Sequence, residues 1–98
     1  MAFCIDDGTE QATMDKLSRL APYPVGYANI KIVDRINYDE GAFTATLNLY
    51  VSREAREQDP ERCMHYCIGG PYTTAPQGQD LRDWAYAEVG LLLEGLPS

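Results

Sequence analysis

A β-hairpin between residues 29 and 52 constrains the fold of this chain more than any other feature. Two segments in which apolar and polar residues alternate flank a turn sequence at residues 39–42, as expected for antiparallel strands with one buried face. One register keeps the apolar residues of both segments on the same face, whereas a slip of one residue mixes them with the polar ones. That register pairs Tyr38 with Phe43, Ile36 with Ala45, Ile32 with Leu49 and Ile30 with Val51. The hairpin therefore predicts a half-buried antiparallel sheet.

Asp34 interrupts the apolar face of the first strand, where this register places it opposite Leu47. A β-bulge near Val33 and Asp34, or an end of the sheet that is open to solvent, accounts for a carboxylate at this position. The alternative is a buried functional carboxylate with a raised pKa. No histidine or second carboxylate close in the sequence supports that alternative, so we expect the bulge or the open end.

A first helix is predicted over residues 9–21, before the hairpin. Thr9 or Asp7 is a suitable N-cap, and Met14 and Leu17 lie on a narrow apolar stripe at helical spacing. Two prolines, at positions 22 and 24, end the helix. Because the stripe is narrow, the helix must pack against other elements to be stable.

A charged connector and a third strand are predicted after the hairpin. Ser52 can cap one or two helical turns that end before Pro60. Residues 63–68 alternate again, which predicts a strand, and the Gly-Gly-Pro sequence at residues 69–71 is expected to end it.

The last helix begins after Asp80, which is a suitable N-cap, and Gly95 is expected to take the left-handed conformation beyond its end. We therefore predict a single α+β domain over residues 1–98. It has an N-terminal helix, an antiparallel sheet of about three strands built on the hairpin, and a C-terminal helix packed on one face.

The charge of the chain argues against several classes of function. Eight basic and fifteen acidic residues give a net charge of −7, which disfavours binding to nucleic acid or to an anionic membrane surface. No segment is apolar over the length of a bilayer, and the N-terminal residues do not resemble a signal peptide. Three cysteines without an export signal predict reduced thiols in the cytoplasm.

Candidate metal ligands occur together only in the predicted third strand, at Cys63, His65 and Cys67. His65 can share an ion with one flanking cysteine, but the two cysteines lie about 13 Å apart along a strand, and the spacing typical of structural zinc sites is absent. We expect these residues to pack in or beside the sheet. We predict no catalytic residue, no metal site and no cofactor, and so a protein that is not an enzyme.

Two compositional features indicate binding to other proteins. The last helix carries leucines around more of its circumference than one buried face requires, and seven tyrosines give the chain many side chains suited to interfaces. An edge strand of a small sheet also invites pairing with a neighbouring chain. The predicted contact residues are Leu91, Leu92, Leu93, Leu96, Tyr50 and Tyr72.

The sequence from Leu47 to Arg56, LNLYVSREAR, and the segment DWAYA at residues 83–87 resemble small accessory proteins encoded near the structural genes of tailed bacteriophages. In that group, a two-stranded ribbon ends in a similar corner and is followed by a strand and an Ala-Tyr-Ala helix. The resemblance implies a virion or assembly protein of the tail or baseplate region, present in several copies and contacting other virion proteins or copies of itself. It assigns no functional residue.

The alternative is an acidic inhibitor, made during infection, that blocks a host enzyme or a nucleic-acid-binding complex. Its carboxylates would occupy a basic cleft on the target. Glutamates and aspartates at residues 54–61 alternate with arginines, which favours the assembly protein over the inhibitor. Either function places the chain in the virion or in the cytoplasm of the infected bacterial host.

Overall fold

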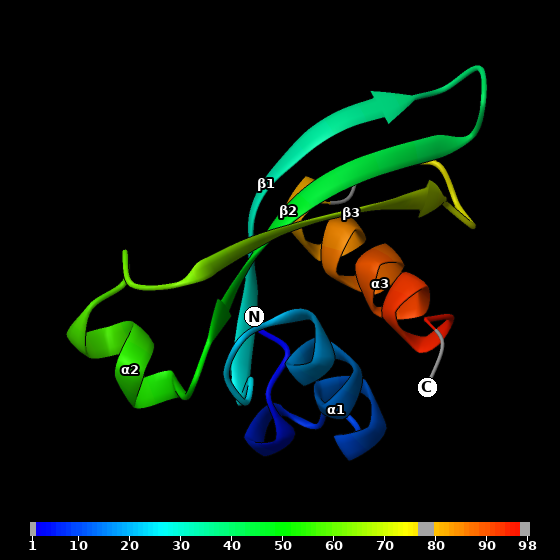
Figure 1. The fold of residues 1–98 in the computed structure, drawn as a ribbon. Coiled ribbons are helices and arrows are strands. Elements are labelled where there is room, and N and C mark those ends of the chain that lie inside the picture. The colour runs from blue at the N-terminus through cyan, green and yellow to red at the C-terminus, as the bar shows by residue number, and fades with distance from the viewer. Residues whose placement is uncertain (1, 77–79, 97–98) are drawn as a thin grey trace.

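The computed structural model describes residues 2–76 and 80–96 as an α+β fold, in agreement with the prediction (Figure 1). In chain order the elements are η1 (Ile5–Asp7), α1 (Gln11–Leu20), β1 (Tyr27–Asn37), β2 (Ala42–Tyr50), α2 (Arg53–Gln58), β3 (Met64–Pro71) and α3 (Leu81–Glu94). The strands form one antiparallel sheet in the order β1-β2-β3. Helices α1 and α3 lie on one side of the sheet, and α2 lies beyond one end of it (Figure 1).

Strand β1 pairs with β2 in a register that differs from the predicted one. Register shifts at Lys31 and at Asp34 insert two bulges, so Ile30 faces Leu47 and Ile36 faces Phe43. The bulge at Asp34 confirms the expectation for that residue, whose carboxylate accepts a hydrogen bond from the Thr46 hydroxyl at 2.7 Å. The bulge at Lys31 was not predicted.

The two bulges change which β1 residues face the core. Ala28, Ile30, Val33 and Ile36 lie opposite the inward-facing residues of β2, whereas Ile32 pairs with Thr46 on the outer face and is 53% exposed. The prediction that Ile32 lies on the buried face is therefore wrong. A bulge adds one residue to one strand and reverses the faces of every residue beyond it.

The hairpin turn comprises residues 38–41, one residue earlier than predicted. Asn37 pairs with Ala42, and Gly41 has a φ of 66°, which glycine adopts without strain. The side chain of Asn37 accepts a hydrogen bond from the Glu40 amide at 3.1 Å. Tyr38, predicted to face Phe43 across the strands, instead lies in the turn and is 66% exposed.

The core lies between the inner face of the sheet and the two longer helices. Alternate residues of β2 supply its centre, as the alternation predicted, and α1 and α3 cover them. Tilted aromatic pairs join Phe43 to Trp84 and Phe3 to Tyr86. The largest fully buried side chains are Phe43, Met14, Leu17, Leu47, Leu49, Leu93 and Val89.

The helix ends agree with the sequence in part. The Ser52 hydroxyl accepts the Ala55 amide at 3.1 Å, and the Asp80 carboxylate accepts the Arg82 amide, as predicted for N-caps. Neither Thr9 nor Asp7 caps α1, whose N-cap is Glu10, because the Thr9 hydroxyl accepts the Cys4 amide instead. The C-cap residue Gly95 has a φ of −79°, so the left-handed conformation predicted for it is wrong.

Strand β3 continues through the Gly-Gly-Pro sequence that was expected to end it. Gly70 faces α3 so closely that a Cβ atom there would lie 2.7 Å from a methyl carbon of Leu92. Glycine therefore lets the strand continue beneath the helix, where any larger residue would meet the Leu92 side chain.

Candidate contact surfaces

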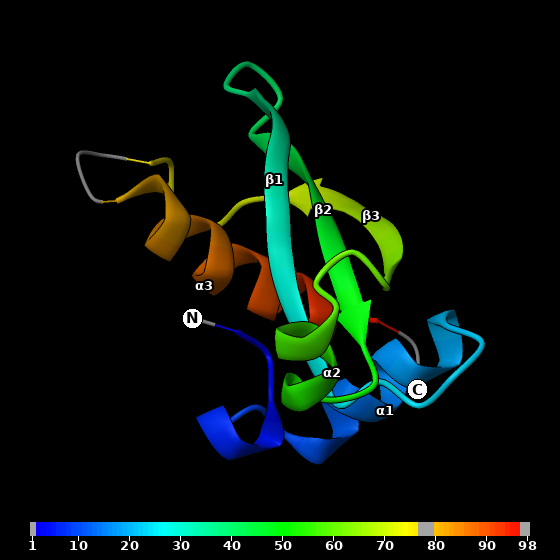
Figure 2. The same cartoon turned by 90° about the vertical axis from the view of Figure 1, so that its left-hand side faces the viewer.

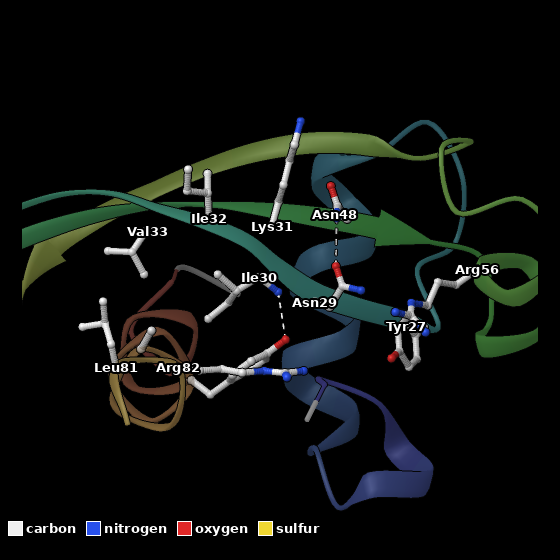
Figure 3. A pocket seen from close by; sticks show the side chains of 12 residues that line it. Tyr27, Asn29, Ile30, Lys31, Ile32, Val33, Asn48, Arg56, Leu81 and Arg82 are labelled. Carbon is white, nitrogen blue, oxygen red and sulfur yellow. Dashed lines mark hydrogen bonds between the residues drawn. The ribbon is translucent and has the colours of Figure 1, made fainter. Parts of the chain in front are cut away.

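A groove of about 740 Å³ lies between β1 and the first turns of α3 (Figure 3). Ile30 and Val33 approach it from β1, and Leu81, Ala85 and Tyr86 approach it from α3. In Figure 2, the N-terminal half of α3 extends past β1 on the side away from β3. Ile32 and Leu81, two of the few large hydrophobic side chains that are strongly exposed, line this groove.

The charged residues of the groove are all basic. Lys31, Arg56 and Arg82 line it, and none of its lining residues is acidic. None of these three cations forms a salt bridge with an acidic residue within residues 2–76 and 80–96. Arg56 lies over the ring of Tyr27 and Arg82 over the ring of Tyr86, both at 5.9 Å from the ring centroid, which holds the guanidinium groups near the hollow.

The two edges of the sheet differ in how far they are protected from other strands. On β1, Ala28 exchanges both backbone hydrogen bonds with Phe3, and the Ile30 amide donates to the Tyr86 hydroxyl at 3.0 Å. The rest of that edge carries two bulges and the charged residues Lys31 and Asp34. Bulges and charges are the usual protection of an edge strand against pairing with another chain.

Strand β3 forms the other edge and has none of this protection. Its register with β2 is regular from Met64 to Pro71, and it contains no lysine, arginine, aspartate or glutamate. Along antiparallel strands, residue pairs that exchange backbone hydrogen bonds alternate with pairs that do not. The Ile30 amide faces away from β2, and this fixes the alternation across the whole sheet. The amides of His65, Cys67 and Gly69 therefore face away from β2, toward the open edge. The edge therefore presents three regularly spaced donors.

A row of polar side chains crosses the outer face of the sheet. Nδ1 of His65 lies 2.8 Å from the Asn48 side-chain oxygen, and the Asn48 amide donates to Asn29 at 3.0 Å. Cys67 is exposed on the same face, and Cys63 packs against a separate small cluster of Cys4, Tyr27 and Tyr50. Within the described residues, no three His, Cys, Asp or Glu side chains are grouped so that they could hold a metal ion.

The six predicted contact residues are not brought together on one surface. Only Leu91 is strongly exposed, at 48%. Leu92, Leu96 and Tyr72 are partly buried against the core, and Leu93 is fully buried within it. Most leucine side chains of α3 thus pack against the core between the sheet and α1, so little leucine surface remains exposed for contact with a partner.

Tyr50, another predicted contact residue, is 2% exposed and stabilises the fold instead. Its hydroxyl donates to the Pro60 carbonyl at 2.6 Å. Burial, and then the neighbouring Cys63 thiol, raises the pKa of Tyr50 to about 12. The side chain is therefore a neutral hydrogen-bond donor that fixes the segment after α2.

Glu88 is a buried carboxylate that the sequence did not single out. It accepts hydrogen bonds from the Thr73 amide and hydroxyl and from the Thr74 amide, at 2.8 to 3.1 Å. Burial alone would raise the pKa of Glu88, but these donors outweigh it and hold the pKa below its ordinary value. The Trp84 indole donates to the Thr74 carbonyl at 2.6 Å, so both side chains fasten the segment after β3 to α3.

Comparisons with protein-family models, with curated proteins and with solved structures give no match to this chain. Among the residues that the structure describes, no helix combines the length and the hydrophobicity needed to cross a membrane.

Proposed function

We propose that this protein is a small non-enzymatic assembly protein that acts through contacts with copies of itself and with other proteins. The observation that supports this most directly is the unprotected edge of β3, eight residues long, regular and uncharged. An edge of this kind pairs readily with another strand. The contrast with the protected β1 edge favours β3 as the site of association.

The partner that fits this edge best is the β3 strand of a second copy. Antiparallel pairing about a twofold axis places the same residues of both chains in one self-complementary contact. Because β3 contains no lysine, arginine, aspartate or glutamate, the pairing sets no like charges of these residues opposite each other. The charges that give each chain its net −7 then lie outside the contact, where salt screens them over about 8 Å.

The test is the mass of the protein in solution, measured by light scattering after size exclusion with a reductant present, so that Cys67 forms no disulfide. We expect the wild type to be a dimer or a larger assembly and Cys67→Lys to be a monomer, because a lysine on an edge strand opposes pairing. Gln58→Lys, at the exposed end of α2, is the matched control and should associate as the wild type does. A monomeric wild type, or an associated Cys67→Lys, would contradict the proposal.

The tail or baseplate of a bacteriophage is the setting that the resemblance implies for such contacts, and we include it in the proposal. Mass spectrometry of purified particles from the phage that carries this gene tests it. Stoichiometric amounts of the chain in particles support a virion component. Consistent absence from particles, with abundant protein in infected cells, rules out the virion role.

The acidic inhibitor is the second candidate, and one observation favours it. Glu54, Glu57, Asp59 and Glu61, in α2 and the segment after it, are all exposed. A row of exposed carboxylates suits a basic cleft on a target. A monomeric chain that co-purifies from infected cells with a host enzyme, and loses it when these four residues are changed to amides, would support the inhibitor over the assembly protein.

A further inference from the structure

The groove between β1 and α3 combines apolar and basic residues, in a protein that is acidic as a whole. Its lining includes the aliphatic residues Ile30, Val33 and Ala85 and the basic residues Lys31, Arg56 and Arg82. The chain has fifteen acidic residues and eight basic ones, yet the groove has three basic residues and no acidic one. The local charge is therefore opposite to that of the whole chain.

We propose that this groove binds an extended acidic segment of a partner protein, in which carboxylates alternate with apolar side chains. In an extended segment, successive side chains point to opposite sides, so apolar residues can enter the hollow while carboxylates reach its sides. Arginine suits this contact because its planar guanidinium pairs with a carboxylate through two parallel hydrogen bonds. Ile32 and Leu81, exposed by 53% and 46%, would be covered by the bound segment.

The two guanidinium groups are held in position before any partner binds. Each lies over a tyrosine ring that is only 7% exposed, Arg56 over Tyr27 and Arg82 over Tyr86, at 5.9 Å from the ring centroid. The Tyr86 hydroxyl is itself fixed by the Ile30 amide. Prior ordering of the two side chains reduces the conformational entropy that is lost on binding.

An acidic peptide fits the groove better than a nucleic acid does. A polyphosphate chain that continued beyond the groove would meet the carboxylates that give the chain its charge of −7. A short peptide needs only the groove. Part of the lining, moreover, is aliphatic, which suits aliphatic side chains of a partner.

This inference rests on the proposed function in treating the protein as a partner of other chains, but it concerns a different surface from the β3 edge. The probe is a fluorescein-labelled peptide of about ten residues in which glutamate and leucine alternate, an extended span of about 33 Å. Binding is measured by fluorescence anisotropy at low ionic strength, up to about 1 mM protein. Its location is mapped by shifts in the amide resonances of the ¹⁵N-labelled protein, expected at Ile30, Val33 and Ala85.

The double variant Arg56→Gln and Arg82→Gln tests the role of the guanidinium groups. Its matched control changes Arg19 and Arg62, both exposed and outside the groove, to glutamine and lowers the net charge equally. We expect the groove variant to weaken binding at least about tenfold, or about 1.4 kcal/mol, and the control to change it little. Circular dichroism and thermal unfolding verify that both variants are folded.

Several results would overturn the inference. The first is that no amide resonances of groove residues shift at the highest protein concentration. The second and third are that a peptide of alternating lysine and leucine binds as tightly as the glutamate peptide, and that both double variants weaken peptide binding equally. The fourth is that oligothymidylate binds in the groove more tightly than the glutamate peptide does. The β3 variant Cys67→Lys separates this inference from the proposed function. Cys67→Lys should abolish self-association and leave peptide binding intact. The groove variant should weaken peptide binding and leave self-association intact.

Discussion

Glu88 gives the most direct test of how α3 holds the segment that follows β3. The side chain is 4% exposed, and within residues 2–76 and 80–96 its hydrogen bonds come from Thr73 and Thr74. Glu88→Gln keeps the shape of the side chain but removes its charge. It also replaces one accepting oxygen by an NH₂ group, which cannot accept hydrogen bonds from the Thr73 and Thr74 donors. A hydrogen bond to a charged group contributes about 1.5–3 kcal/mol, against about 1 kcal/mol for a neutral one.

The expected loss follows from three donors that each lose about 1 kcal/mol. Thr73 and Thr74 are exposed, so water can accept part of the hydrogen bonding that their donors lose. The free energy of unfolding should therefore fall by about 2 kcal/mol. For a domain of this size each kcal/mol shifts Tm by about 4–8 °C, so Tm should fall by about 10 °C.

The dependence on pH distinguishes a charge effect from a packing effect. The Thr73 and Thr74 donors lower the pKa of Glu88 below the ordinary value of 4.5 in spite of burial. A group with a lowered pKa in the folded state stabilises the fold above its unfolded pKa, and this contribution is lost as the pH falls through the folded pKa. The difference between wild type and Glu88→Gln should therefore be constant from pH 7 to about 5 and shrink below about pH 4.

Urea denaturation followed by fluorescence measures this difference. Trp84, the only tryptophan, donates to the Thr74 carbonyl and so reports on the same segment. Glu94→Gln, an exposed carboxylate of the same helix, is the control and should change stability by less than about 0.5 kcal/mol. Equal stability of the two variants at pH 7, or a Glu88→Gln loss that persists unchanged at about pH 3, would refute the reasoning.

Three further substitutions concern stability. Gly26→Ala should destabilise the fold by at least about 2 kcal/mol, since its Cβ would lie 2.4 Å from the Val51 carbonyl oxygen. Gly90→Ala, inside α3, should instead stabilise it by about 0.5–1 kcal/mol, because its Cβ would make only an ordinary contact with the Phe3 ring at 3.7 Å. Tyr23→Phe should cost about 1–3 kcal/mol, because the Tyr23 hydroxyl accepts the Met64 amide at 2.9 Å. Chemical denaturation measures all three, and an unchanged Tyr23→Phe or a Gly26→Ala no worse than Gly90→Ala would contradict these assignments.

The features that the sequence predicted correctly depend on local physics. Alternation gives the face of each residue in β2 and β3, and side-chain oxygens at Ser52 and Asp80 cap the helices that follow them. These features are determined within a few residues. Thr9 is the counterexample, because the backbone amide that its hydroxyl accepts belongs to Cys4 and not to α1.

The contact surfaces could be predicted only in part. An unpaired strand edge was expected from the small size of the sheet, but nothing in the sequence says which edge is protected, since Phe3 and Tyr86 reach β1 from distant parts of the chain. Leucine content overestimated the contact role of α3, because that helix is covered by both the sheet and α1. Glu88 left a signal that was visible in retrospect, a carboxylate at an inward position of a helix between Trp84 and Val89.

The unpredicted bulge at Lys31 links the main error in the register to the groove. In the sequence, Ile30 and Ile32 are two residues apart and belong on the same face of a regular strand. In the structure, Val33 lies inward in place of Ile32 because the pairing of β1 with β2 shifts by one residue between Ile30 and Ile32, which a local pattern in β1 does not specify. The inserted residue then leaves Lys31 and Ile32 on the outer side of β1, from which they line the groove on the side of the strand opposite Arg82. A single inserted residue thus keeps the core filled and places a cation and an exposed aliphatic side chain at the same groove.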